Sequence, residues 1–285
     1  MKDILSEIIA HKKVEIASQK DAVSLQHLRG QAAIVLHEGT TPCRSMKSAL
    51  AASATGIIAE FKRRSPSKGW INESARSEEI PVAYEAGGAS ALSILTDERF
   101  FGGSLRDIRT ARPLVNIPIL RKDFIIDEYQ LLQARIVGAD AVLLIAACLT
   151  PEQCNDLTLL AHELGLEVLL EIHSPSELSY INKEIDMVGV NNRNLGSFTT
   201  DVENSFRIAG QLREATNGTE FPLLVSESGV WVLSAAGYTV VVRETDSGLS
   251  VMVDGSAIAM ESGAVRLDNG EVYISDMFLR TALRA

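Results

Sequence analysis

The sequence predicts an α/β fold of the TIM (β/α)8 barrel type, and three observations support this prediction. Apolar runs of strand length alternate with helical segments between residues 56 and 229, as in a parallel sheet covered by helices. Seven such runs are present, and five of them end in charged or polar residues. An open doubly wound sheet gathers its ligand groups at one switch point, whereas a closed barrel presents them at the carboxyl ends of many strands. The barrel is therefore favoured.

Residues 1–55 are predicted to form an N-terminal helical extension ahead of the barrel. The first part of this extension has the apolar spacing of an amphipathic helix, carried by Leu5, Ile8, Ile9 and Ile16. Another helical stretch and a connector containing Thr41 and Pro42 lead to the first strand.

Strands and helices alternate through the predicted barrel domain, residues 56–245. The strand-like runs lie at 57–69, 89–95, 118–124, 139–147, 167–171, 187–193 and 222–229. Helices are expected at 77–86, 104–111, 127–137, 151–164 and 175–182. Several of them begin at Ser, Asp or Thr-Pro, which suit a helix start, and are closed by a glycine before the next strand.

Charge and composition exclude several classes of protein. The net charge of −10 argues against general binding of nucleic acid, although a few local Lys and Arg side chains can still bind a small anion. The three cysteines form no CxxC pattern, which predicts free thiols in a reducing cytosol. The chain lacks an apolar targeting segment and a membrane-spanning run, so we expect a soluble, cytoplasmic protein. The five histidines show no metal-ligand spacing, and His173 is expected to be a loop residue.

The strand ends carry the candidate chemistry. Alternate residues of a strand share a face, so Glu60 and Lys62 point to the same side. Burial of such a charged pair is costly unless the two groups are paired or used, which makes them candidate site residues. The same argument singles out polar residues at the ends of other runs: Lys122, Glu171, Asn191 with Arg193, and Glu227.

The order of the motifs carries a resemblance to a known family. The chain contains, in sequence, IIAEFKRRSPSKG, SILTDERFFGGSL, PILRKDFIIDEYQ, ADAVLLIAACL, LLEIH, VGVNNRNL and LVSESG. Together with the helical extension, these motifs closely resemble indole-3-glycerol-phosphate synthase from residue 1 to about residue 230. Chance agreement is negligible because so many segments keep the same order and spacing.

This resemblance implies closure of an indole ring without a metal or an organic cofactor. In the family, 1-(2-carboxyphenylamino)-1-deoxyribulose 5-phosphate reacts when an aromatic carbon attacks the ribulose carbonyl; carbon dioxide leaves and water is then lost. Such chemistry needs an acid at the carbonyl, a group that holds the carboxylate, a base and a phosphate clamp. The implied partner is this small phosphorylated substrate, without nucleic acid or membrane; a monomer and a homo-oligomer both remain open.

The resemblance also implies roles for the strand-end residues. Lys122 is the general acid that protonates the carbonyl, and Glu171 is its partner base or acid. Lys62 contacts the substrate carboxylate and assists in dehydration. The groups that orient the substrate and tune the two lysines are Glu60, Asn191 and Glu227.

Implied substrate-binding residues surround this set: Ser65, Arg64, Phe101, Phe124, Arg193, Ser228 and Gly229. The serine and arginine of the first loop lie by anionic groups, and the two phenylalanines pack on the anthranilate ring. Arg193 and Ser228 complete the polar rim, and Gly229 offers a backbone N–H to the phosphate. Each assignment has a structural alternative, such as a rim ion pair, a capped loop or a core aromatic residue.

After Gly229 the chain departs from the family pattern. Too few residues lie between Val230 and Gly237 for a crossover helix, since a parallel crossover usually needs about ten or more. The eighth βα unit is therefore atypical, with 240–244 as the candidate eighth strand. A third segment, 246–285, is predicted to have β-hairpin character, with hairpins at 249–260 and 264–274. An engineered or fused tail, a reading-frame change and a natural replacement all fit this segment.

Two further hypotheses compete with an active synthase. Because half of the family's phosphate clamp is missing, we expect weakened phosphate binding, and the main alternative is a catalytically impaired barrel remnant or an interaction module with exposed hairpin edges. Another phosphate-binding barrel, such as phosphoribosylanthranilate isomerase, is disfavoured. Its chemistry uses a Cys and an Asp, whereas this chain aligns two lysines with two glutamates.

Overall fold

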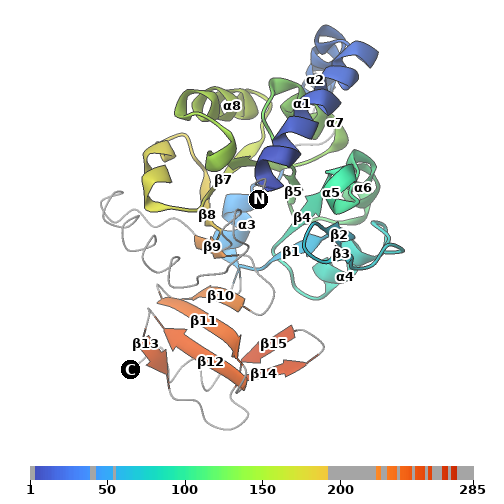
Figure 1. Ribbon diagram of the computed structural model, residues 1–285. Helices are drawn as coiled ribbons and strands as arrows, with labels where there is room; N and C mark the ends of the chain where they lie inside the picture. The colour runs from blue at the N-terminus through green and yellow to red at the C-terminus, as the bar shows by residue number, and fades with distance from the viewer. Residues whose placement is uncertain are drawn as a thin grey trace.

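The computed structural model describes residues 4–38, 43–53 and 56–191, and beyond them only the backbone of the strands between residues 223 and 274. Seven strands form one sheet in chain order: β1 (Ile58–Phe61), β4 (Ala91–Leu95), β5 (Ile119–Lys122), β6 (Ala141–Ile145), β7 (Glu167–Ile172), β8 (Met187–Val190) and β9 (Leu223–Val225). Every pair of neighbours is parallel (Figure 1). This topology confirms the predicted TIM barrel type and brings the carboxyl ends of all seven strands to one edge.

Helices occupy most of the predicted segments, but the helix expected from Ser77 begins only at Ile80, and a short helix at Glu98–Phe101 was not predicted. The extension consists of α1 (Ile4–Ala22), α2 (Leu25–Glu38) and α3 (Met46–Ala52). The later helices are α4 (Ile80–Ala86), α5 (Glu98–Phe101), α6 (Leu105–Ala111), α7 (Glu128–Val137) and α8 (Pro151–Glu163), with 3-10 turns at η1 (Arg112–Leu114), η2 (Ala146–Cys148) and η3 (Pro175–Tyr180). The helix expected at 175–182 is therefore wrong in type, because this short segment after Ser174 forms only a 3-10 turn.

Side-chain oxygens cap several of these helices as the sequence predicts. Ser104 and Asp127 accept backbone N–H groups at the starts of α6 and α7. Thr150 and Gln153 form a complete capping box at the start of α8. Gly138 ends α7 with φ +90°, a conformation that favours glycine.

The parallel strands are buried on both faces, so their alternating residues divide into two cores. On β6, Val142 and Leu144 pack toward the helices that surround the sheet. Leu143, the residue between them, packs into the interior with Met46 and Leu50 of α3. The third helix of the extension therefore contributes to the interior of the barrel.

A second, antiparallel sheet follows the parallel one in the chain. It contains β10 (Val230–Ala235), β11 (Tyr238–Thr245), β12 (Gly248–Val253) and β13 (Ser256–Ile258), while β14 (Val265–Asp268) and β15 (Glu271–Ile274) form a separate hairpin. The two predicted hairpins are confirmed by the antiparallel pairs β12–β13 and β14–β15. The interpretation of 240–244 as an eighth barrel strand is wrong, because β11 pairs antiparallel with β10 and β12. Only two residues separate β10 from β11, too few for the crossover that a strand parallel to β9 would need.

A buried lysine fastens the first helix to the barrel. Lys12 of α1 is fully buried, although lysine is rarely so, and its Nζ lies 3.0 Å from Asp97 Oδ2 and 3.0 Å from Asp123 Oδ1. Asp97 follows β4 and Asp123 follows β5. Glu15, one turn along α1, supplies a third oxygen at 3.0 Å. The extension is thus held against the carboxyl ends of two adjacent strands.

Neighbouring groups complete this ionic cluster. Arg121 of β5 donates to Asp123 Oδ2 at 2.8 Å, and the Thr96 hydroxyl donates to the same oxygen at 2.7 Å. Burial alone would raise the pKa of Asp123, but the charges of Arg121 and Lys12 outweigh burial and lower it to about 2. Burial alone would lower the pKa of Lys12, but its carboxylate neighbours raise it. Lys12 and Asp123 are therefore both charged at neutral pH.

The variant Lys12→Met should lower the free energy of unfolding by about 3 kcal/mol, because two buried carboxylates lose their ammonium partner. Chemical denaturation measures this change. Lys13→Met is the matched control on the same helix, since Lys13 is exposed and its replacement should have little effect. Equal stability of the two variants would contradict a fastening role for Lys12.

Stability should also depend on the charge of Asp123. Its pKa falls from an ordinary 3.8 to about 2 on folding, so the ionised group contributes about 2 kcal/mol at neutral pH. This contribution is present above the unfolded pKa and is lost as the pH falls toward 2. The difference in unfolding free energy between wild type and Asp123→Asn should therefore shrink between about pH 5 and pH 2. The exposed Asp21→Asn variant should show no such trend.

Candidate active site

The edge formed by the strand carboxyl ends holds one carboxylate between two ammonium groups. Glu60 of β1 accepts from Lys62 Nζ at Oε1 (2.5 Å) and from Lys122 Nζ at Oε2 (2.8 Å). Lys122 ends β5, which is separated from β1 by β4 alone. The sheet therefore unites two strand ends that are 62 residues apart in sequence, and the predicted pairing of Glu60 with Lys62 is present.

The charges of this group stabilise one another. Burial would raise the pKa of Glu60, but Lys122 and Lys62 outweigh it and lower the pKa to about 2. Burial would likewise lower the pKa of Lys122, but the carboxylates of Glu60 and Glu171 raise it. Lys122 is therefore a protonated ammonium at neutral pH.

A second carboxylate reaches the same group from the other side. Glu171 of β7 acts electrostatically on Lys122, and its Oε1 accepts a hydrogen bond from Asn191 Nδ2 at 3.0 Å. Asn191 directly follows β8, the neighbour of β7 in the sheet. We call Lys62, Glu60, Lys122, Glu171 and Asn191 the lysine–carboxylate row.

Two aromatic rings lie close together near this row. The ring centroids of Phe101 and Phe124 are 5.9 Å apart at an angle of 36°. Phe101 ends α5 after β4, and Phe124 follows Lys122 by two residues and packs partly on the interior core. Both rings are half-buried, so they form an apolar surface at the strand ends that a planar ring can contact.

The first loop holds the predicted Arg64 and Ser65 on the short hairpin of β2 (Arg64–Ser65) and β3 (Gly69–Trp70). The Arg64 guanidinium donates to the Arg99 carbonyl at 3.0 Å and lies over the Trp70 ring at 5.5 Å. The Ser65 hydroxyl accepts the Lys68 N–H at 3.2 Å. These contacts order the loop and lie outside the lysine–carboxylate row.

Four predicted site residues lie outside the described residues: Arg193, Glu227, Ser228 and Gly229. Their positions therefore stay predictions.

The structure adds residues that the sequence reasoning missed. His173, Glu177, Lys12, Asp97 and Asp123 all lie at or against the strand ends. The two aspartates carried a usable signal, since each directly follows an apolar strand. Lys12 carried another, because it interrupts the apolar stripe of an amphipathic helix.

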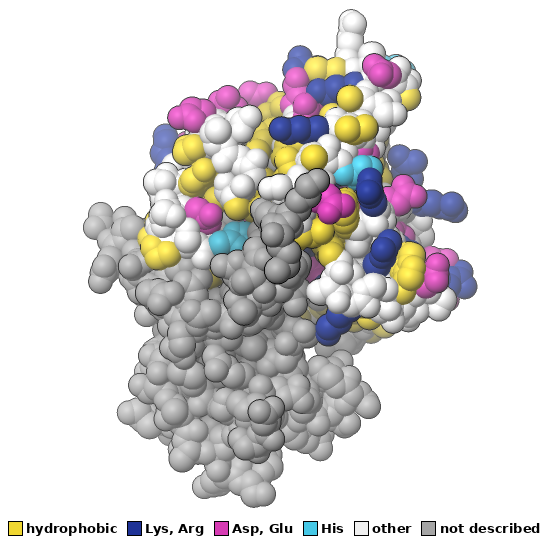
Figure 2. Space-filling view, in the orientation of Figure 1, with side chains coloured by type: hydrophobic (Ala, Val, Ile, Leu, Met, Phe, Trp, Pro, Cys, Tyr) yellow, Lys and Arg dark blue, Asp and Glu magenta, His cyan; other side chains and the backbone are white. Residues whose placement is uncertain are grey.

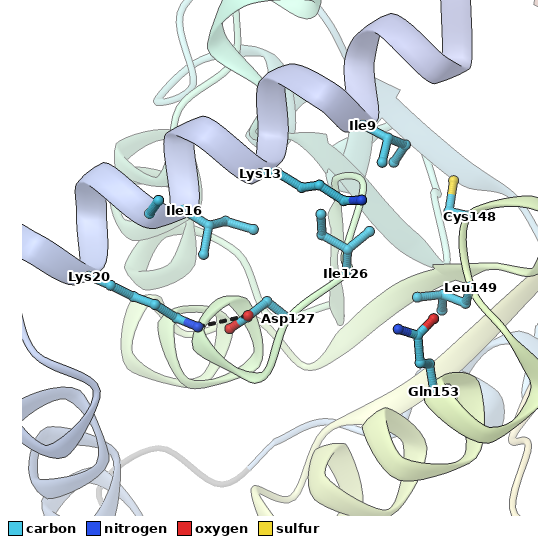
Figure 3. A pocket seen from close by; sticks show the side chains of 10 residues that line it. Ile9, Lys13, Ile16, Lys20, Ile126, Asp127, Cys148, Leu149 and Gln153 are labelled. Carbon is cyan, nitrogen blue, oxygen red and sulfur yellow. Dashed lines mark hydrogen bonds and ion pairs between the residues drawn. The ribbon is translucent and has the colours of Figure 1, made fainter.

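A pocket of about 340 Å³ lies between α1 and the loops after β5 and β6 (Figure 3). Apolar side chains such as Ile16, Ile126 and Leu149 share its wall with polar ones, and the Lys20–Asp127 ion pair (2.7 Å) lies at one end. No member of the lysine–carboxylate row lines this pocket. The charged groups of the candidate site therefore belong to a different place at the strand ends.

The described residues also limit the kinds of site. Across them, no three His, Cys, Asp or Glu side chains are grouped to hold a metal ion. None of the helices in these ranges has the length and apolar character that crossing a bilayer requires. On the described part of the face in Figure 2, basic side chains are interspersed with acidic ones rather than gathered in one patch.

Comparison with known proteins places this geometry in a family context. The family model for indole-3-glycerol phosphate synthase matches residues 5–253, which continues past the end of the motif resemblance near residue 230. An indole-3-glycerol phosphate synthase of Bacteroides thetaiotaomicron is 66% identical over 233 residues, covering 81% of this chain and 84% of that protein. Proteins of the same name from Neisseria meningitidis serogroup C and Rhodopirellula baltica are 43% and 42% identical, covering 86% and 80% of this chain and 94% and 84% of their own.

The variant Glu60→Gln should lower the pKa of Lys122, because the amide removes the carboxylate that holds its proton. We expect a fall of about one unit or more in the pH midpoint at which Lys122 becomes reactive toward an acylating reagent. Peptide mass spectrometry after timed labelling measures this midpoint for each lysine. Glu184→Gln, beside the exposed Lys183, is the matched control. An unchanged Lys122 midpoint in Glu60→Gln would contradict the coupling.

Proposed function

Because the chain belongs to the indole-3-glycerol phosphate synthase family, we propose that it closes the indole ring of 1-(2-carboxyphenylamino)-1-deoxyribulose 5-phosphate with loss of carbon dioxide. The family makes it a carboxy-lyase of tryptophan biosynthesis. The observation that carries the mechanism is the Glu60 carboxylate shared by the ammonium groups of Lys62 and Lys122. It supports a site in which two cations are held ready at one edge of the sheet.

Lys122 is the general acid in this proposal. Its raised pKa keeps the ammonium protonated at neutral pH. When the aromatic carbon attacks the ribulose carbonyl, the oxygen becomes an alkoxide, which is more basic than an amine, so the proton moves from Lys122 Nζ to that oxygen. Glu60 orients the ammonium before the transfer, and afterward its carboxylate remains paired with Lys62.

Lys62 binds the substrate carboxylate in this proposal. Its side chain is more exposed than that of Lys122, and Glu60 positions its ammonium. Lys62 thereby holds the group that later leaves as carbon dioxide. Lys62 then assists the departure of water by protonating the leaving hydroxyl group.

Glu171 is the base that removes the proton lost after ring closure, and Asn191 fixes the orientation of its carboxylate. Phe101 and Phe124 offer the apolar surface on which the anthranilate ring packs. Arg64 and Ser65 lie in the loop after β1, from which they would approach the anionic groups of the substrate. The roles carried by resemblance alone remain those of Arg193, Glu227, Ser228 and Gly229.

We further propose that the protein acts in the cytoplasm without an added cofactor. The reaction consists of carbon–carbon bond formation, proton transfers, decarboxylation and dehydration, and the lysine–carboxylate row contains acids and bases for the proton transfers. A competing hypothesis, an interaction module without catalysis, is favoured by one observation, the antiparallel sheet that begins at Val230. Measurement of turnover decides between the enzyme and the interaction module.

Purified protein mixed with the carboxyphenylamino substrate should produce an indole, followed by its fluorescence. Lys122→Ala should lower kcat by about 100- to 10,000-fold, because the carbonyl loses its acid. Lys183→Ala, at an exposed position, should leave turnover unchanged. Turnover that survives in Lys122→Ala would remove Lys122 from the mechanism, and a folded protein without turnover would support the interaction module.

A further inference from the structure

A histidine lies between two carboxylates beside the candidate base. His173 follows β7, and its Nε2 lies 3.5 Å from Glu171 Oε1. Its Nδ1 lies 3.8 Å from Glu177 Oε2, the oxygen that also accepts the His173 backbone N–H at 2.5 Å. All three side chains are largely buried, so their charges are only weakly screened by solvent.

Glu177 is placed to keep a proton on this histidine. It belongs to η3, the 3-10 turn that follows β7. Its carboxylate accepts the backbone N–H of His173, the residue whose ring it faces. Burial would lower the pKa of His173, but the carboxylates of Glu177 and Glu171 outweigh burial and raise it. Burial would raise the pKa of Glu177, but His173 lowers it.

Among the described residues, the charges around Glu171 balance only when His173 is protonated. Lys122 faces Glu171 from β5, but the same ammonium is already hydrogen-bonded to Glu60. Three carboxylates are present, those of Glu60, Glu171 and Glu177. They are balanced by three cations: Lys62, Lys122 and an imidazolium at His173. Loss of that proton leaves one carboxylate in excess in a largely buried site, which is unfavourable.

We propose that His173 is a positioning residue that keeps the Glu171 carboxylate directed toward Asn191 while Glu177 anchors the imidazolium. The inference rests on the proposed function, because Glu171 is the base of that mechanism. His173 does not exchange protons with the substrate in this scheme. It maintains the orientation of the group that does.

The first test is independent of turnover. Coupling is reciprocal, so a histidine that stabilises the Glu171 charge must itself be stabilised in its protonated form by that charge. The pKa of His173, followed by NMR of its ring protons, should fall by about one unit in Glu171→Gln and again in Glu177→Gln. His162, paired with Asp186 at 2.8 Å, is the internal reference in the same spectra.

The second test measures the effect on the reaction. His173→Asn should lower kcat about tenfold with little change in KM, because the side chain acts through Glu171 rather than on the substrate. Wild-type kcat should fall as the pH rises through the pKa of His173, and His173→Asn should lack this limb. Glu177→Gln should move the limb to lower pH, and His162→Asn should leave both kcat and the limb unchanged.

Each outcome decides between the two claims. A His173 pKa that is identical in wild type and Glu171→Gln would overturn the inference even for an inactive protein. A wild-type limb that persists in folded His173→Asn, checked by circular dichroism, would also overturn it. Failure of the wild type to turn over would instead count against the proposed function, while the NMR titrations would still decide the coupling.

Discussion

Parallel pairing in chain order is the constraint on which the candidate site depends. It aligns the carboxyl ends of β1, β5 and β7, so residues more than 100 positions apart in sequence meet at one edge. Charged side chains gathered at such an edge must neutralise one another, because each loses much of its hydration. Glu60 does so for Lys62 and Lys122, and the same requirement explains the carboxylates around His173.

One strand end joins the chemistry to the architecture. Alternate residues of β5 face opposite sides of the sheet, so Lys122 faces the interior while Arg121 and Asp123 face the helices. The interior side carries the proposed acid, and the outer side carries the ionic cluster around Lys12. Because Asp123 directly follows Lys122, the position of the proposed acid is linked to the helix that precedes the barrel.

Local pattern predicts most elements but not the long-range ion pairs. The seven strands, most helices and both late hairpins follow from apolar periodicity and turn residues, and the Glu60–Lys62 pair follows from alternation within one strand. The burial of Lys12 does not, because its partners lie 85 and 111 residues away and only the folded chain brings them together. The pairing of His173 with Glu177 depends on a 3-10 turn that resembles a helix in sequence. The antiparallel pairing of β11 likewise overrides a motif that suggested a barrel strand.

The buried Lys12 also constrains the order in which the chain can assemble. During synthesis α1 is made well before two of its charged partners, Asp97 and Asp123. Docking α1 before they are in place would bury the ammonium without the two aspartates and leave it only the partly exposed Glu15, which is unfavourable. We therefore expect α1 to stay undocked until β4 and β5 have formed. Docking of α1 therefore follows completion of β5, the strand that carries the proposed acid.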